Sequence, residues 1–333
     1  MKIAVVGLGY WGPNLVRNFL GINAVSGVIG CDKDPMRLEK IKVRFPEIET
    51  TLDYNAILKR EDIEAVAVVT SVSSHYAIAK AALEAGKHCF IEKPMTATVA
   101  QAEDLINLAE KKGLKIMVDH TFIYTGAVKK MKEIIDQGRL GDIYYFDSVR
   151  VNLGLFQHDV NVIWDLAPHD ISIMDFLLQK KPTSVSAVGS CHVGNGLEDI
   201  AYLTVNFDNN LIAHFHVNWI APVKVRTTLI GGAKSMIVYD DMENSEKVKV
   251  YDKGIEVKTQ EGVYETLVQY RTGDMYAPKL EQTEALTLEA NHFIDCIQND
   301  KSPLTDGISG LNVVRILEAS EKSIKQNGKA VAV

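Results

Sequence analysis

The sequence predicts two α/β domains: a doubly wound parallel sheet over residues 1–122, then an α/β domain with a mostly antiparallel sheet over residues 123–333. Three observations support this. In the first third of the chain, short apolar runs alternate with helical patterns, which is typical of a parallel sheet covered on both faces. From residue 184 to about residue 259, strand-like segments follow one another without helices, as in antiparallel sheets. A length of 333 residues also suffices for two ordinary domains.

The expected strands of the first domain are short apolar runs, and the expected helices begin or end at capping or helix-breaking residues. The strands are Lys2–Val6, Val25–Cys31, Ala65–Thr70, His88–Ile91 and Lys115–Val118. The helices are Pro13–Leu20, a helix capped by Asp34, His75–Ala85 and Thr98–Lys112. The two domains are expected to join directly near His120–Thr125.

The second domain is expected to combine helices with the run of strands. The helices are Gly126–Gln137, Asp165–Leu178, Glu284–Gln298 and Leu311–Gln326, and a long strand covers Ile143–Val151. Turn signals within the run of strands include Asp208–Asn210 and Gly231–Gly232.

Composition narrows the class of protein. A hydrophobic fraction of 47% and a charged fraction of 24% are typical of a folded globular chain. The net charge of −7 disfavours a nucleic-acid partner. No apolar stretch reaches the ~18 residues of a membrane span, and the first residues indicate a strand rather than a signal peptide. The four cysteines form no CxxC pair. We therefore expect a cytoplasmic protein without a disulfide framework or a metal site.

The strongest motif is Gly7-Leu-Gly9-Tyr10-Trp11-Gly12, which matches GxGxxG. It follows a predicted strand and begins a predicted helix, the context of a dinucleotide-binding Rossmann fold. Glycines allow a tight turn and a close approach of the pyrophosphate, and the helix N-terminus attracts the phosphates. A purely structural glycine turn is the alternative.

Asp32 ends the second strand, where a carboxylate can accept hydrogen bonds from the adenine ribose. It would repel a 2′-phosphate, so NAD is expected in preference to NADP. Lys33 and Arg37 lie nearby and weaken this preference.

Glu92-Lys93-Pro94 follows another predicted strand, whose carboxyl end faces the ligand crevice of a doubly wound sheet. Lys93 would point toward the nicotinamide, and Pro94 would fix the turn as a cis peptide. A surface lysine before a helix-breaking proline is the alternative.

A second catalytic candidate is the pair Asp165 and His169, four residues apart in a predicted helix that Asp165 begins, with Pro168 in its first turn. Alcohol oxidation removes a proton from oxygen and a hydride from carbon. Histidine is suited to taking the proton, and a lysine ammonium favours the developing alkoxide. The alternative is that Asp165 is only an N-cap and His169 an ordinary helix histidine.

With these motifs in order, the chain resembles the glucose–fructose oxidoreductase / inositol dehydrogenase / MocA (Gfo/Idh/MocA) family over essentially its whole length. The resemblance implies a Rossmann domain followed by an α/β domain with a large open sheet that often forms the oligomer interface, here of a homodimer or homotetramer. It also implies that Lys93 is the EKP lysine, His169 the proton acceptor, and Asp165 its companion on the substrate.

Two segments depart from the family pattern. Many members have Thr-Pro where this chain has Thr70-Ser71, and a glycine run where it has Asn161-Val-Ile-Trp164. The segment from Arg150 to Ser172 is similar to the sugar-nucleotide branch. Its members oxidise C3 of a UDP-linked amino sugar ahead of an aminotransferase, which places them in polysaccharide biosynthesis.

Weaker candidates are assigned by position alone. Thr70, Ser71 and His75 follow a strand and are expected to contact the cofactor, together with Glu92, Lys93 and Pro94. For Thr70–His75 the alternative is a helix start that is capped by Ser73 or Ser74. Candidate substrate contacts, besides Lys93, Asp165 and His169, are His120, Tyr124, Arg150, Asn152, Gln157 and His158.

The leading functional hypothesis is therefore an NAD(P)-dependent dehydrogenase that oxidises C3 of a UDP-N-acetyl-amino sugar such as UDP-N-acetylglucosamine to a 3-keto sugar. A dehydrogenase of free polyols, inositols or aldoses is the alternative. A regulator that binds NAD(H) without turnover is the alternative of another class.

Overall fold

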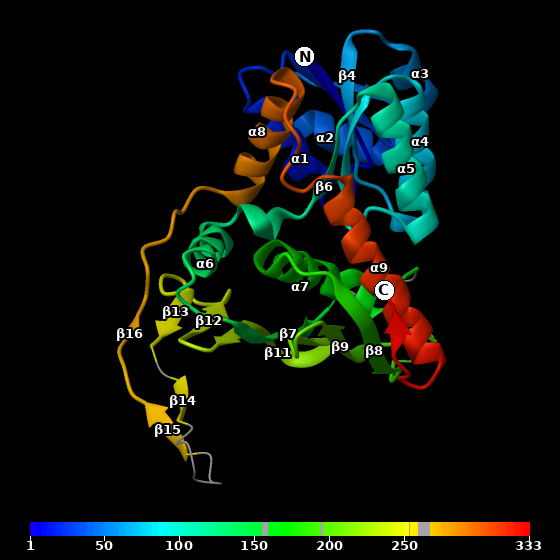
Figure 1. Cartoon of the computed structure of the whole chain (residues 1–333). Helices are drawn as coiled ribbons and strands as arrows, with labels where there is room; N and C mark the ends of the chain where they lie inside the picture. Colours follow the sequence, from blue (N-terminus) through cyan, green and yellow to red (C-terminus); the bar gives the residue numbers. More distant parts are fainter. Residues whose placement is uncertain (155–158, 194–195, 253, 259–266) are drawn as a thin grey trace. The chain divides into compact units, whose positions relative to one another are not determined.

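The computed structural model describes residues 1–154, 159–193, 196–252, 254–258 and 267–333 (Figure 1). Two of the weaker candidates, Gln157 and His158, lie outside the described residues, as does residue 259, where the predicted run of strands ends. The chain forms two compact units, Met1–Tyr124 with Thr283–Arg315, and Thr125–Gln282 with Ile316–Val333. Among the helices within the described ranges, none is both long and apolar enough to cross a membrane.

The first unit contains a six-stranded parallel sheet in the order β3-β2-β1-β4-β5-β6. This is the order of a Rossmann fold, so the predicted fold class of the first domain is confirmed. The strands are β1 Lys2–Val6, β2 Gly27–Cys31, β3 Glu49–Thr51, β4 Ile63–Val68, β5 His88–Glu92 and β6 Ile116–Asp119. The helices are α1 Gly12–Leu20, α2 Pro35–Arg44, α3 Tyr54–Lys59, α4 Val72–Glu84, α5 Val99–Lys112, η1 Thr121–Tyr124 and α8 Ala285–Gln298.

The prediction omitted β3 and α3. β3 has only three residues, none of them buried, and therefore no apolar alternation. α3 has six residues, of which only Ile57 is buried. β3 is fixed by its pairing with β2 rather than by its own pattern, and α3 is too short to show a helical period.

Helix α8 belongs to the first unit, although the sequence prediction assigned all residues after 122 to the second domain. Its Phe293 ring lies 5.5 Å from that of Phe90 on β5 and 6.5 Å from that of Phe19 on α1. Thr287 donates to Asn18 on α1 at 2.7 Å. These contacts join segments about 200 to 270 residues apart in the sequence (Figure 1), which no local pattern predicts.

The second unit contains a nine-stranded sheet in the order β16-β13-β12-β11-β7-β10-β9-β8-β17. Among the described strands of this sheet only β7 and β10 pair in parallel, so the predicted, mostly antiparallel sheet is confirmed. The strands are β7 Ile143–Leu153, β8 Pro182–Ser190, β9 Ile200–Phe207, β10 Ile212–Asn218, β11 Ile220–Gly232, β12 Met236–Asp240, β13 Val248–Tyr251, β16 Met275–Tyr276 and β17 Val331–Ala332. A separate pair is formed by β14 Gly254–Lys258 and β15 Leu267–Arg271.

Helices α6 Gly126–Asp136 and α7 Val162–Leu178 pack against each other, and α7 also packs on β7, β9 and β10 (Figure 1). α9, Gly307–Lys325, begins four residues before the predicted Leu311 because Asp306 accepts from the Ser309 amide at 2.9 Å and caps it. The predicted turn at Asp208–Asn210 is confirmed, with positive φ at Asn209 and Asn210.

The predicted turn at Gly231–Gly232 lies slightly further along the chain: both residues end strand β11, and the chain reverses between Gly232 and Met236 to begin β12. A Cβ atom at Gly231 would lie 2.1 Å from the Tyr145 ring, and one at Gly232 would lie 2.4 Å from the Leu140 carbonyl oxygen. Glycine is therefore needed at both positions for close packing, against Tyr145 on β7 and against Leu140 in the segment before β7.

Candidate active site

The glycine-rich loop joins β1 to α1, and two of its glycines are required by their surroundings. Gly7 has φ +99°, and a Cβ atom there would lie 2.3 Å from the Val69 carbonyl oxygen. A Cβ atom at Gly12 would lie 2.1 Å from the Gly7 oxygen. At Gly9 the nearest atom to a Cβ would be Arg37 Nη1 at 3.6 Å. The chain itself therefore leaves Gly9 open, as an approaching pyrophosphate requires.

The two aromatic residues of this loop differ in environment. Tyr10 is 87% exposed. Trp11 precedes α1, and its indole Nε1 donates to Oδ2 of Asp119 at 2.7 Å. This hydrogen bond attaches the loop after β1 to the end of β6. In the sheet, β4 and β5 lie between these two strands.

Asp32 lies just after β2 and is buried. Its carboxylate accepts from the Leu8 amide at 2.7 Å and from the Asp34 amide at 3.0 Å, and Arg37 Nη1 lies 3.4 Å away. Asp32 therefore supports the glycine-rich loop from the position where a ribose hydroxyl would be held. Arg37 is about half exposed, and Lys33 is exposed.

His75 has a different environment from the predicted cofactor contact. The ring is 1% exposed, with Nδ1 3.0 Å from the Pro94 oxygen and Nε2 2.9 Å from the Thr70 oxygen. Burial lowers the pKa of His75. The imidazole thus joins the loop after β4, which contains Thr70 and Ser71, to the loop after β5. In this geometry it positions both loops rather than offering a nitrogen to a ligand.

Strand pairing places the ends of β4, β5 and β6 at one edge of the sheet, since Val68 pairs with Ile91 and Glu92 with Asp119. Lys93 follows Glu92, and the Lys93–Pro94 peptide is cis, as predicted. The parallel sheet therefore gathers the glycine-rich loop, Thr70, Lys93 and His120 at its carboxyl edge. In a doubly wound sheet this edge binds the ligand.

His120 follows β6 and is 1% exposed, and neither ring nitrogen has a hydrogen-bond partner among the described residues. Burial, with a smaller effect of the positive charge of Lys93, lowers the pKa of His120 to about 3. This histidine is therefore neutral at physiological pH, with one donor and one acceptor available. That environment fits the predicted contact with a polar ligand.

Tyr124, another predicted substrate contact, is 2% exposed and packs within the first unit. Its hydroxyl lies 3.2 Å from the Thr305 hydroxyl, and its ring lies 5.8 Å from that of His292. Tyr124, at the end of η1, therefore packs η1 against α8 in this structure.

In the second unit, α7 carries Asp165 and His169 one turn apart. The helix begins at Val162, three residues before the predicted start, because Asn161 accepts from the Ile163 and Trp164 amides at 3.1 and 3.2 Å. Pro168 consequently lies in the second turn of the helix and not in the first. In the second turn a proline leaves the carbonyl four residues earlier without its helical donor.

The Asp165 carboxylate is held by Trp219, whose Nε1 donates to Oδ2 at 2.9 Å. Trp219 is fully buried and lies between β10 and β11. Sequence reasoning missed Trp219, because it is 54 residues from Asp165 and no local pattern links the two.

Arg150 on β7 is buried and forms a bidentate ion pair with Asp170 on α7, with Nε–Oδ2 and Nη2–Oδ1 distances of 2.6 and 2.9 Å. It is 2% exposed. The predicted role as a substrate contact does not fit this geometry, because the guanidinium fork is engaged in attaching α7 to the sheet. Asn152, near the end of the same strand, is partly exposed.

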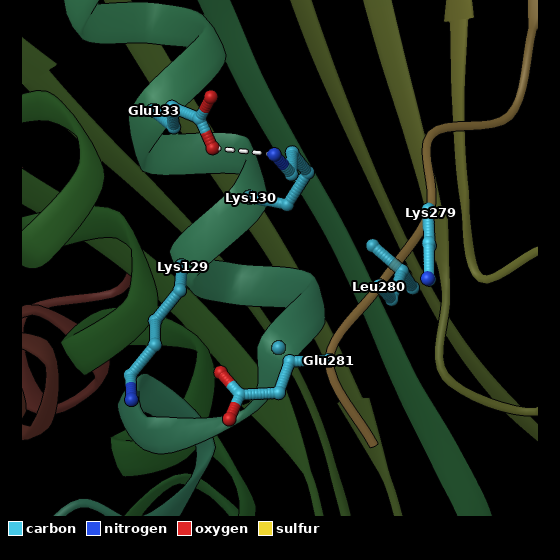
Figure 2. A pocket seen from close by; sticks show the side chains of 7 residues that line it. Lys129, Lys130, Glu133, Lys279, Leu280 and Glu281 are labelled. Carbon is cyan, nitrogen blue, oxygen red and sulfur yellow. Dashed lines mark hydrogen bonds and ion pairs between the residues drawn. The ribbon is translucent and has the colours of Figure 1, made fainter. Parts of the chain in front are cut away.

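A hollow of about 550 Å³ lies in the second unit between α6 and residues 279–281 (Figure 2). Its lining comprises Gly126, Lys129, Lys130, Glu133, Lys279, Leu280 and Glu281. Lys130 is paired with Glu133 at 2.5 Å. None of the predicted site residues within the described ranges lines this hollow.

Two further residues of the first unit were missed. Asp119 is the last residue of β6, and a polar residue directly after an apolar run at this edge is a signal that sequence analysis could have used. Glu289 is completely buried on α8, between Leu286 and Phe293 on the apolar face of the helix. An acidic residue inside an apolar stripe is likewise a detectable signal.

Comparison with known proteins agrees with this architecture. The model of an oxidoreductase family with an NAD-binding Rossmann fold, named GFO_IDH_MocA, matches residues 1–120, and the model of the GFO/IDH/MocA C-terminal domain matches residues 128–238. Together these matches cover more than half of the chain.

Among similar proteins, UDP-N-acetylglucosamine 3-dehydrogenase of Acidithiobacillus ferrooxidans is 25% identical over 94% of each chain. The NAD⁺-dependent scyllo-inositol 2-dehydrogenase of Bacillus subtilis is 24% identical over 99% of this chain and 96% of its own. A solved structure of the Acidithiobacillus enzyme covers 98% of each chain with a TM-score of 0.81 at 24% identity, which shows the shared fold. On the family matches to both of its domains, this chain belongs to the Gfo/Idh/MocA oxidoreductase family and has its NAD-binding Rossmann domain.

Proposed function

We propose that the protein oxidises a secondary hydroxyl of a sugar nucleotide, at C3 of a UDP-N-acetyl-amino sugar, and transfers the hydride to NAD. The observation that carries this proposal is the full-length similarity to a UDP-N-acetylglucosamine 3-dehydrogenase, with 94% of each chain covered. The residues required for the chemistry are present, namely Lys93 after β5 and Asp165 with His169 on α7.

The proposed mechanism assigns one task to each side chain. Bound NAD would accept the hydride. The Lys93 ammonium would donate to the reacting hydroxyl oxygen and favour the developing alkoxide, while the His169 imidazole would take the hydroxyl proton. Asp165, held by Trp219, would orient His169 or a neighbouring sugar hydroxyl. This assignment requires all three side chains to act on the same sugar carbon.

The cofactor site fits a dinucleotide in its chemistry. Gly9 presents backbone without a side chain, and α1 begins at Gly12 with its N-terminal amides. Asp32 favours NAD because its carboxylate would repel the 2′-phosphate of NADP. Arg37, at 3.4 Å from Asp32, reduces this preference. Asp32→Asn should raise the ratio of kcat/KM for NADP to that for NAD, and an unchanged ratio would contradict this role of Asp32.

The decisive experiment measures NADH formation with UDP-N-acetylglucosamine, UDP-linked amino sugars, free aldoses and inositols. We expect turnover with a UDP sugar and a ketone at C3 of the product by NMR. His169→Asn should lower kcat by a factor of about 10² to 10⁴, since this is the usual contribution of a general base. NADH binding should change little. Turnover of free sugars but not UDP sugars would reject the substrate assignment.

The runner-up function, oxidation of free polyols, is favoured by the similarity to scyllo-inositol 2-dehydrogenase over 99% of this chain. The same substrate panel separates it from the first. A regulator that binds NAD(H) without turnover is the third hypothesis. It would be supported by NADH binding together with no conversion of any substrate in the panel.

We also propose a cytoplasmic homodimer or homotetramer that assembles through the sheet of the second unit. All four cysteines are free thiols, as in reducing compartments. On the face away from α7, the side chains of Val188, Tyr202 and Ile212 are 43–53% exposed. The Tyr202 ring stacks on that of His216 at 4.4 Å. Tyr202→Asp should reduce the mass measured by light scattering, whereas an unchanged mass would contradict this interface.

A further inference from the structure

The dipeptide Glu198-Asp199 contacts both of the segments that meet in the hydrogen bond between Trp219 and Asp165. It directly precedes β9, which begins at Ile200. Glu198 contacts the start of α7, the helix that carries Asp165, and Asp199 contacts the backbone of Trp219. All of these residues belong to the second unit. One dipeptide therefore holds the segments of both the donor and the acceptor.

Glu198 determines how Asn161 caps α7. Nδ2 of Asn161 donates to Oε2 of Glu198 at 2.8 Å, and the Val162 amide donates to the Glu198 carbonyl oxygen at 3.0 Å. Asn161 is buried, and its Oδ1 accepts from the Ile163 and Trp164 amides. Because the asparagine side chain has one donor end and one acceptor end, the Glu198 carboxylate selects the orientation in which Oδ1 faces the helix. The first turn of α7 therefore starts from this contact.

Asp199 holds Trp219 from one side through its backbone. Its carbonyl oxygen accepts from the Trp219 amide at 2.9 Å. Its buried carboxylate accepts from the His192 and Val193 amides at 2.6 and 2.9 Å, which attaches the dipeptide to the segment after β8. On the other side, the Gly154 amide donates to the Trp219 carbonyl oxygen at 2.9 Å. The backbone of Trp219 is thus fixed at both its N–H and its carbonyl group.

Two glycines leave room for the side chains of Trp219 and Glu198. A Cβ atom at Gly154 would lie 2.4 Å from Cδ1 of the indole, and one at Gly189 on β8 would lie 2.7 Å from Cγ of Glu198. Each side chain therefore packs directly on a backbone segment, which restricts the positions that it can adopt. The indole held in this way places its Nε1 2.9 Å from Oδ2 of Asp165.

We propose that Glu198 is a positioning residue of the active site. By accepting from Asn161 it sets where α7 begins. Because Asp199 is the next residue, the same contact fixes the helix relative to Trp219, and Asp165 then meets the indole donor. The inference rests on the proposed function, in which Asp165 takes part in the reaction. Loss of the Glu198 contact should impair turnover and leave NAD binding intact, since the Rossmann unit is not altered.

The first test measures kcat with whichever sugar of the substrate panel is turned over, and NADH affinity by titration. Glu198→Leu removes the acceptor for Asn161 and should lower kcat about three- to tenfold, the size of effect expected for one lost hydrogen bond. Glu198→Gln retains an oxygen for Asn161 and should keep kcat within about twofold of wild type. NADH affinity should be unchanged in both variants.

A donor–acceptor exchange tests the contact itself. Asn161→Asp retains an oxygen for the amides of α7 but places a carboxylate against that of Glu198, so it should lower kcat as Glu198→Leu does. Combining Asn161→Asp with Glu198→Gln should restore kcat, because the glutamine amide can donate to the aspartate. Ser323→Ala is the structural control. It removes the buried acceptor of the Ala187 amide, at 2.8 Å in the same unit, and should reduce stability with kcat unchanged.

The indole of Trp219 provides a readout that does not depend on turnover. The chain has three tryptophans, so the signal that Trp219→Phe removes from the proton–nitrogen NMR spectrum identifies the indole of Trp219. This signal should move in Glu198→Leu and stay in place in Ser323→Ala. If wild type converts no sugar of the panel, the proposed function fails, and the Trp219 signal then decides the positioning role of Glu198.

A double-mutant cycle provides the last comparison. Glu198→Leu should add little to the loss of kcat caused by Trp219→Phe, since both changes act on Asp165 through one hydrogen bond.

The proposal would be overturned by wild-type kcat or an unmoved Trp219 signal in Glu198→Leu, by additive effects in the cycle, or by an exchange variant that does not recover. A loss of kcat in Ser323→Ala equal to that in Glu198→Leu would also overturn it, because the effect would then be general destabilisation. If Glu198→Leu does not fold, the comparison of Asn161→Asp with the exchange variant provides the test.

Discussion

The indole Nε1 of Trp219 donates to Oδ2 of Asp165 at 2.9 Å, so a fully buried residue between two strands orients a carboxylate in the α7 motif. We expect Trp219→Phe to lower kcat several-fold while leaving NADH affinity unchanged, because the donor to Asp165 is lost in the second unit and the NAD-binding Rossmann unit is not altered. Steady-state kinetics beside an NADH titration provide the measurement. Trp164→Phe, on α7 beside Asp165, is the matched control for the change of a buried tryptophan to phenylalanine. Equal kcat values in wild type and Trp219→Phe would refute a role for this contact.

Arg150→Met should destabilise the protein by about 3–5 kcal/mol, because it leaves the buried Asp170 carboxylate without its partner. The double variant Arg150→Met with Asp170→Leu should regain much of this loss, since no buried charge remains. Urea denaturation of the three proteins provides the measurement. The original prediction, that Arg150 contacts the substrate, leads to the opposite result: a higher KM with unchanged stability.

The glycines of the cofactor loop should differ in their response to alanine. Gly9→Ala has room within the protein and should fold with an unchanged Tm, but its methyl group should obstruct the pyrophosphate and weaken NADH binding. Gly12→Ala would place Cβ 2.1 Å from the Gly7 oxygen and should lose both stability and NADH binding. Thermal melts and NADH titration distinguish the two. A Gly12→Ala protein as stable as wild type would contradict this account.

The stability of the protein should fall on acidification partly because of His120. Burial lowers the pKa of His120 to about 3, below its ordinary value of about 6.5. Between these values the unfolded chain binds a proton that the folded chain does not. This single residue should therefore remove up to about 1.4 kcal/mol of stability per pH unit as the pH falls from about 6.5 toward 3.

His120→Leu should flatten this acid dependence and, if the ring nitrogens bind substrate or cofactor, also reduce turnover. Urea denaturation at several pH values, for this variant and wild type, measures the difference. His214→Leu is the control, because it removes a histidine of β10 in the second unit whose side chain is 43% exposed. An identical pH dependence of stability in wild type and His120→Leu would show that His120 is not held neutral in the folded protein.

The sequence by itself determined the two architectures and the motifs of the first unit. Strand, GxGxxG and helix are adjacent in the chain, so local periodicity and glycine spacing predicted the Rossmann fold, the position of Asp32 and the cis Lys93–Pro94 turn. The spacing of Asp165 and His169 likewise placed them on one face of α7. These features depend on interactions between residues that are close in sequence, so they can be recognised from the amino-acid sequence alone.

Tertiary structure decided which polar side chains are engaged and with what. Arg150, Tyr124 and His75 were predicted as ligand contacts from their positions in the sequence, yet each is buried and bound within the protein: by Asp170, Thr305 and the Pro94 carbonyl. Trp219 donates to Asp165, and α8 returns to the first unit, where Thr287 donates to Asn18. Such pairings join residues up to 269 positions apart, because burial and hydrogen bonding depend on distance in space and leave no periodic trace along the chain.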